Sequence, residues 1–187
     1  MGRLPLKKQI IDNAAIELFA TKGLAETSIR DVSTKAGVTV GALYRYYKSK
    51  NEMAWELFCK ELDVFTQGLK AIVAQNNQPV ETLKKSIEYI YEYYEKEPLK
   101  FAFILLTQHG FPDEQLLDEE NNPNDVVIRG VKALFDEVTI SDHKVLAGML
   151  MGAILQPIVM HNYGRFDKPV TAYVDDVVSI CIKMIKP

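Results

Sequence analysis

Apolar residues recur at intervals of three and four along almost the whole of this 187-residue chain, and no segment alternates convincingly between apolar and polar residues. The first such run contains Leu6, Ile10, Ala14, Leu18 and Phe19. This spacing places apolar side chains on one face of an α-helix, whereas a half-buried strand needs a period of two. The pattern therefore predicts an all-α fold of about nine helices, over residues 6–22, 28–35, 39–46, 49–74, 83–97, 99–109, 124–138, 142–162 and 169–186.

Capping residues and helix breakers mark several of these boundaries. Ser28 with Asp31, and Ser49 with Glu52, have the spacing of a capping box and open the second and fourth helices. Pro157 lies inside an apolar run and predicts that its helix is kinked or ends there.

Charge divides the chain into two parts. The first fifty residues hold nine basic and four acidic residues, a net charge of +5, while residues 51–187 hold 13 and 21, a net charge of −8. A basic module attached to an acidic body makes nucleic acid a candidate partner for the first part alone. We therefore predict a domain boundary near the start of the fourth helix, giving domains 1–48 and 49–187.

Three short helices lie within about forty residues, with glycine at the turn between the second and third. This arrangement is typical of a helix-turn-helix module. Its short helices need burial against the first helix, which leaves polar side chains facing outward. Hydroxyls, phenols and cations suit phosphate oxygens and the edges of bases in a groove. The candidate DNA-binding residues are Ser28, Arg30, Thr39, Val40, Gly41, Tyr44, Arg45, Tyr46, Lys48 and Lys50.

These residues resemble a known family. The runs Thr27–Val32, Ala36–Val38 and Gly41–Lys50 are similar to the signature of the TetR family of transcriptional regulators over about residues 5–55. The resemblance implies that the last two long helices form a homodimer, which matches a palindromic double-stranded DNA operator. It also implies an effector that weakens operator binding, and repression as the default outcome. Tyr44 and Lys50 would contact the DNA backbone.

The helical body is rich in aromatic residues, which suits a small, largely apolar or aromatic effector that the sequence does not identify. For each aromatic residue taken singly, a place in the ordinary core is the better interpretation. The candidate effector-binding residues are Trp55, Phe58, Tyr89, Tyr93, Phe101, Leu105, Gln108, His109, Met149 and Gln156.

Other classes of function are less well supported. No metal-ligand spacing, glycine-rich phosphate loop or catalytic constellation is present, so neither an enzyme nor a cofactor is expected. A DNA-binding protein of the same fold without an effector remains an alternative. Cys59 and Cys181 lie in apolar helical patterns, which predicts buried thiols, and we expect a cytoplasmic protein with no membrane partner.

Overall fold

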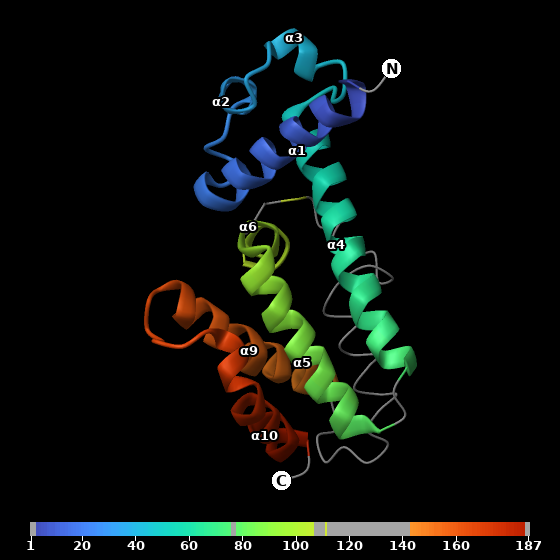
Figure 1. Ribbon diagram of the computed structural model, residues 1–187, viewed down its shortest axis with the longest axis vertical. Helices are drawn as coiled ribbons and strands as arrows, with labels where there is room; N and C mark the ends of the chain where they lie inside the picture. Colours follow the sequence, from blue (N-terminus) through green and yellow to red (C-terminus); the bar gives the residue numbers. More distant parts are fainter. Residues whose placement is uncertain (1–2, 76–77, 107–110, 112–142, 186–187) are drawn as a thin grey trace. The chain divides into compact units, whose positions relative to one another are not determined.

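The computed structural model describes residues 3–75, 78–106, 111 and 143–185 (Figure 1). Those residues contain eight α-helices, one π-helical turn and one 3-10 turn, and no strand. The all-α fold class is therefore confirmed. The helix expected at 124–138 lies outside the described residues.

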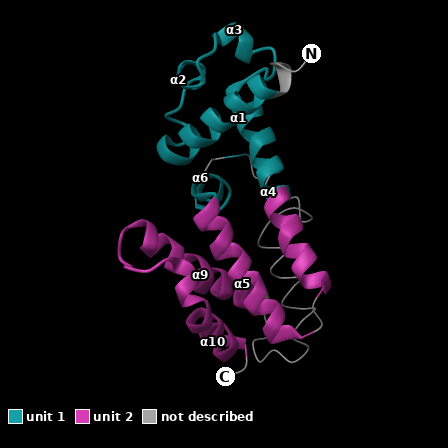
Figure 2. Cartoon of the chain, in the orientation of Figure 1, with its two compact units in different colours: residues 1–63, 97–116 teal, residues 64–96, 117–187 magenta. Residues whose placement is uncertain are grey.

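The chain forms two compact units (Figure 2). Unit 1 comprises residues 1–63 and 97–116, and unit 2 comprises residues 64–96 and 117–187. The division falls inside the long helix α4 (Lys50–Gln75), and it assigns residues 97–116 to the same unit as the N-terminus. The division into domains 1–48 and 49–187 stays a prediction.

Unit 1 is built on α1 (Arg3–Lys22), against which α2 (Ile29–Lys35) packs. The short α3 (Val40–Leu43) packs against α2 in turn. The buried face of α1 includes Ile11, Ala15 and Phe19, which are fully buried. By contrast Leu6 and Ile10 are 61% and 44% exposed, so the apolar run at the start of α1 does not reach the core.

The second segment of unit 1 completes this core. It begins with α6 (Pro98–Phe101) and continues into the π-helical turn η1 (Ala102–Leu106), where the sequence predicts one helix over 99–109. Both elements pack on α1. Phe103 is fully buried, and its ring lies 6.0 Å from that of Phe19 and 6.1 Å from that of Phe58. A cluster of aromatic rings thus joins residues from two distant parts of the sequence.

Unit 2 contains the second half of α4, α5 (Pro79–Lys96), α9 (His143–Asn162), the 3-10 turn η2 (Val170–Tyr173) and α10 (Val174–Ile185). Helix α10 packs against both α5 and α9. The Tyr91 hydroxyl donates to the carbonyl oxygen of Ile154 over 3.1 Å, which joins α5 to α9 inside the core. Helix α9 continues for five residues beyond Pro157, so of the two expected outcomes, a kink or an end, the helix does not end there.

The two cysteines differ in their surroundings. Cys181 is fully buried in unit 2, and burial raises the pKa of its thiol to about 11. Cys59 is exposed on α4, because its position in the helix faces away from Leu57 and Phe58. The prediction of a buried thiol is therefore confirmed for Cys181 and wrong for Cys59.

Candidate DNA-binding surface and effector-binding residues

The start of α2 is fixed by a reciprocal capping box. The Ser28 Oγ atom accepts from the Asp31 backbone N–H over 3.1 Å, and the Asp31 carboxylate accepts from the Ser28 N–H over 2.8 Å. Lys22 of α1 lies 3.0 Å from the same carboxylate. The backbone hydrogen bond from Ser28 and the nearby ammonium of Lys22 lower the pKa of Asp31 to about 2. The arrangement leaves Ser28 and Arg30 exposed at the N-terminal turn of α2.

The turn between α2 and α3 depends on Gly37. Its φ of 64° lies in the left-handed region, which residues with a side chain adopt at a cost. The N–H of Val38 then donates to the Ser33 carbonyl oxygen over 2.9 Å, and this bond closes the turn. The chain is thereby redirected into α3 within four residues.

Helix α3 is shorter than the sequence predicts. The Thr39 hydroxyl caps its start by accepting from the Ala42 N–H over 3.2 Å, and regular helix ends at Leu43 rather than Tyr46. Leu43 is the fully buried anchor of the helix. Turns then present Tyr44 and Arg45 to solvent, Tyr44 with 52% of its surface exposed.

A second set of caps fixes the start of α4. The Ser49 hydroxyl accepts from the Glu52 N–H over 3.0 Å, and the Glu52 carboxylate accepts from the Lys48 N–H over 2.7 Å. The Lys50 ammonium donates to the carbonyl oxygen of Leu24 over 2.7 Å. Lys48 is exposed, whereas Lys50 is half-buried against the turn between α1 and α2.

All ten candidate DNA-binding residues therefore lie in unit 1, on α2, on α3 and the turns after it, and at the start of α4. Most are exposed, with Val40, Tyr46 and Lys50 half-buried. Their contacts with DNA stay a prediction. One feature beneath them was missed: Asp12 lies on the buried face of α1, at 4% exposure, and contacts Tyr47. An acidic residue between Ile11 and Ala15 in an apolar run was the available signal.

Comparison with known proteins identifies the family to which this geometry belongs. Residues 11–57 match the model of the family described as bacterial regulatory proteins, tetR family. Residues 11–57 are therefore a TetR-family domain.

Curated relatives agree with this assignment over part of their length. The chain is 31% identical over 111 residues to the HTH-type transcriptional regulator YerO of Bacillus subtilis, a match that covers 58% of this chain and 38% of YerO. It is 26% identical over 86 residues to an HTH-type transcriptional regulator of Staphylococcus aureus, covering 46% of each. The chain thus spans less than half the length of the relatives it matches.

Solved structures show that the fold of this chain is shared over nearly its whole length. A Clostridium perfringens protein described as a fatty acid metabolism regulator has a TM-score of 0.79 at 23% identity, covering 95% of this chain and 99% of that one. The regulator FadR from Bacillus subtilis, solved in complex with stearoyl-CoA, has a TM-score of 0.74 at 18% identity, covering 95% and 99%.

Eight of the ten candidate effector-binding residues lie in the described part of the chain, in three groups. Trp55, Phe58, Phe101 and Leu105 lie in unit 1, and the rings of Trp55 and Phe58 each lie within 5.2 Å of that of Phe111. Tyr89 and Tyr93 lie in unit 2, where both rings pack on Phe65. Met149 and Gln156 are exposed on α9, and Gln108 and His109 lie outside the described residues. Their grouping into one site stays a prediction.

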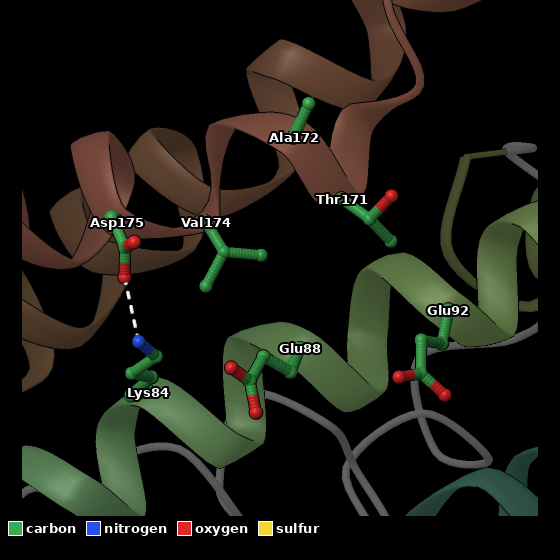
Figure 3. Close-up of a pocket in the computed structure, with 7 residues that line it drawn as sticks. All are labelled: Lys84, Glu88, Glu92, Thr171, Ala172, Val174 and Asp175. Atoms are coloured by element: carbon green, nitrogen blue, oxygen red, sulfur yellow. Dashed lines mark hydrogen bonds and ion pairs between the residues drawn. The ribbon is translucent and has the colours of Figure 1, made fainter.

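A surface hollow of about 260 Å³ lies in unit 2 between α5 and the segment from η2 to the start of α10 (Figure 3). Glu88, Glu92 and Asp175 line it together with Lys84, whose ammonium lies 2.8 Å from the Asp175 carboxylate. Its polar, mainly acidic wall does not suit an apolar effector, and it contains none of the candidate effector-binding residues.

Helix α9 combines a buried and an exposed apolar face. Leu146, Leu150 and Ile158 are buried, whereas Val145 and Met149 are 53% and 48% exposed. Because both faces are apolar, residues 144–162 fit a membrane span by length and composition alone. One such helix is weak evidence for a membrane span, because a buried core helix of a soluble protein passes the same test.

Proposed function

We propose that this chain is a sequence-specific DNA-binding transcriptional regulator, a repressor that binds a palindromic operator as a homodimer and is released by an apolar effector. The observation that carries the proposal is the outward set of Thr39, Tyr44 and Arg45 on a short, doubly capped segment of a TetR-family domain. Neutral hydroxyls and cations on a convex helical element suit phosphate oxygens and the major groove. The matched relatives are named as transcriptional regulators, which supports this class over an enzyme.

Selection from a random duplex library, followed by mobility shift of the selected sequence at two salt concentrations, tests the DNA-binding part. We expect a palindromic sequence and affinity that falls steeply with salt, because each phosphate contact adds about −0.9 to the log–log salt slope. A chain that selects no sequence would refute the proposal. Selection of a sequence without two-fold symmetry would refute the dimeric mode.

The exposed face of α9 is the proposed dimer interface, together with the neighbouring α10. Val145 and Met149 on α9 and Ile180 on α10 each have about half of their surface exposed. Gly148 and Gly152 have open space where a side chain would project, so two helices could approach closely at this face. A second copy of the chain would cover this apolar surface symmetrically.

Sedimentation of the parent and of Met149→Asp tests the interface. We expect a dimer for the parent and a monomer for the variant, because a carboxylate would be desolvated at the interface centre. The matched control is Tyr163→Asp, which places the same charge at a residue 74% exposed just beyond the end of α9. A monomeric parent, or two dimeric variants, would refute this interface.

For the effector we propose a molecule with a long apolar chain, of the fatty acyl class. The support is the likeness to FadR, which was solved with stearoyl-CoA. A second support is Thr66 of α4, whose hydroxyl is buried with no hydrogen-bond partner within the described part of the chain. A buried hydroxyl without a partner costs free energy that a ligand's polar group would recover.

Titration of the protein–operator complex with acyl-CoA thioesters of increasing length, and with free CoA, tests this class. We expect release by the longer acyl chains and none by free CoA, since burial of each CH₂ contributes about 0.8 kcal/mol. Thr66→Val, which keeps the shape but removes the hydroxyl, should weaken release and leave operator binding unchanged. If no acyl chain releases the complex, the regulator without an effector becomes the better interpretation.

A further inference from the structure

A polar cluster lies beneath the candidate DNA-reading segment, which we define as residues 39–48. The Tyr47 hydroxyl donates to the Asp12 carboxylate over 2.6 Å. Tyr47 is 1% exposed and Asp12 is 4% exposed, so this bond is made inside the core of unit 1. It joins the last turn of the reading segment to the middle of α1.

Two lysines supply the charge that this buried carboxylate needs. The Lys8 ammonium lies 3.2 Å from Asp12, 2.6 Å from the Tyr47 hydroxyl and 3.3 Å from the Glu56 carboxylate. Lys60 of α4 lies 3.7 Å from Asp12. Burial, and then the bond to Asp12, raises the pKa of Tyr47 far above its ordinary value. Tyr47 is therefore a neutral donor at every working pH.

Such a cluster adds little to the stability of the fold, but it can fix the orientation of the segments that it joins. Buried ionic groups lose nearly as much hydration free energy as they recover by pairing, and apolar residues of similar size often stabilise a core better. A short hydrogen bond nevertheless has a defined direction, which an apolar contact at the same place lacks.

The reading segment requires such positioning. Helix α3 has four residues, too few to persist without tertiary contacts, and Leu43 is its buried anchor. The second buried anchor is Tyr47, whose N–H donates to the Leu43 carbonyl oxygen over 3.2 Å. Between the two anchors stand Tyr44 and Arg45, which face solvent. The directions of the Tyr44 and Arg45 side chains therefore depend on the positions of Leu43 and Tyr47.

We propose that Asp12 is a positioning residue for sequence-specific DNA binding, acting through its hydrogen bond to Tyr47. This inference rests on the proposed function. The bond fixes the orientation of the segment that carries Tyr44 and Arg45, and so affects the distinction between operator and other DNA. Attraction to phosphates in general does not depend on it, because that attraction needs charge but little geometry.

The test compares Tyr47→Phe, Asp12→Ala, Asp12→Asn and the double variant Asp12→Ala/Tyr47→Phe with the parent. Affinities for the selected operator and for a scrambled duplex are measured by fluorescence anisotropy, and stability by thermal unfolding. Tyr91→Phe is the matched control, because Tyr91 is also fully buried and its hydroxyl also donates a hydrogen bond, but in unit 2. Amide hydrogen exchange of residues 44–48 provides a readout that needs no DNA.

We expect Tyr47→Phe and Asp12→Ala to weaken operator binding roughly tenfold, the lower end for a hydrogen bond to a charged group. Binding to the scrambled duplex should change by less than about twofold, and exchange at residues 44–48 should accelerate. The double variant should match either single variant, since both remove one bond. Asp12→Asn keeps an oxygen acceptor and should retain most of the affinity.

Three results would overturn the inference. These are unchanged operator affinity in both single variants, fully additive losses in the double variant, or an equal loss in Tyr91→Phe. Each of these results overturns the inference when the parent protein binds its operator. A parent that selects no operator instead contradicts the proposed function itself, and unchanged exchange at residues 44–48 would then contradict the positioning role independently.

Discussion

The Lys50 ammonium donates a hydrogen bond to the carbonyl oxygen of Leu24 over 2.7 Å. It also lies 3.4 Å from the carbonyl oxygen of Ala25. The first residue of α4 therefore holds the turn between α1 and α2, at the edge of the proposed DNA-binding surface. A single side chain thus contributes both to the local structure and to the positive charge of this surface.

Neutralising Lys50 should affect stability as well as DNA binding. We expect Lys50→Ala to lower the free energy of unfolding by about 1 to 2 kcal/mol, because two backbone carbonyls lose a charged donor. Lys48→Ala is the matched control, since the Lys48 side chain is exposed two residues away. It should reduce the salt slope of DNA binding by about 1.8 for a dimer, because each protomer loses one phosphate contact, and it should leave stability unchanged. Thermal unfolding with salt-dependent mobility shift measures both quantities, and equal stabilities would contradict the role assigned to Lys50.

Tyr44 should contribute its hydroxyl to DNA binding and nothing to stability. It is 52% exposed at the end of α3. We expect Tyr44→Phe to weaken operator binding by at least about tenfold, since a hydrogen bond to a charged phosphate contributes about 1.5 to 3 kcal/mol. Tyr163→Phe, which removes an exposed hydroxyl from unit 2, should change neither operator affinity nor unfolding temperature. Equal affinities of the Tyr44 variant and the parent would exclude a contact through this hydroxyl.

The capping box of α2 should lose its effect in acid. The pKa of Asp31 is lowered from 3.8 to about 2 in the folded chain, so its carboxylate stabilises the fold at pH values above 3.8. As the pH falls from about 4 to about 2 the carboxylate binds a proton and this contribution disappears. The gap in unfolding temperature between the parent and Asp31→Asn should therefore be constant above about pH 5 and close in that window. A gap that persists at the lowest pH would show that the charge of Asp31 does not account for its contribution to stability.

Gly68 of α4 should not tolerate a side chain. A Cβ atom there would overlap the hydroxyl end of Tyr89, whose ring packs on Phe65 and whose hydroxyl donates to the Phe65 carbonyl oxygen over 3.2 Å. Alanine improves helix propensity by about 1 kcal/mol, but overpacking costs about 1 to 3 kcal/mol. We expect Gly68→Ala to be destabilising overall in denaturant unfolding. In a Tyr89→Ala background the same change should become stabilising, and destabilisation in both backgrounds would contradict the steric explanation.

The elements of this chain that have local signals could be predicted from sequence. Ser28 with Asp31 fixed the start of α2, and the apolar periodicity located α4, α5 and α9. The end of α3 was placed three residues too late, because the helical pattern of apolar residues continues through Tyr46 while the backbone turns at Tyr44.

Long-range features left no such signal. The position of α6 and η1 against α1 depends on packing between segments some eighty residues apart, which periodicity does not encode. The same holds for the bond between Asp12 and Tyr47. The exposure of Cys59, by contrast, follows from its position on the side of α4 opposite the buried residues. An acidic residue in an apolar stripe indicates that it has a polar partner in the core. That this partner is Tyr47 depends on the tertiary fold, which the local sequence does not encode.

The contact between Phe19 and Phe103 also bears on how the chain is synthesised. Unit 1 draws its residues from two stretches of sequence, and the ring that stacks on Phe19 is encoded forty residues after Asp63. At roughly 5 to 20 residues per second, a ribosome needs about 2 to 8 s to reach it after the first stretch is complete. For that interval Phe19 has no partner ring, while α5 of the other unit has already been made. The core of the nascent DNA-binding module is therefore incomplete until Phe103 has been synthesised. A fragment that ends at Asp63 would lack this ring permanently.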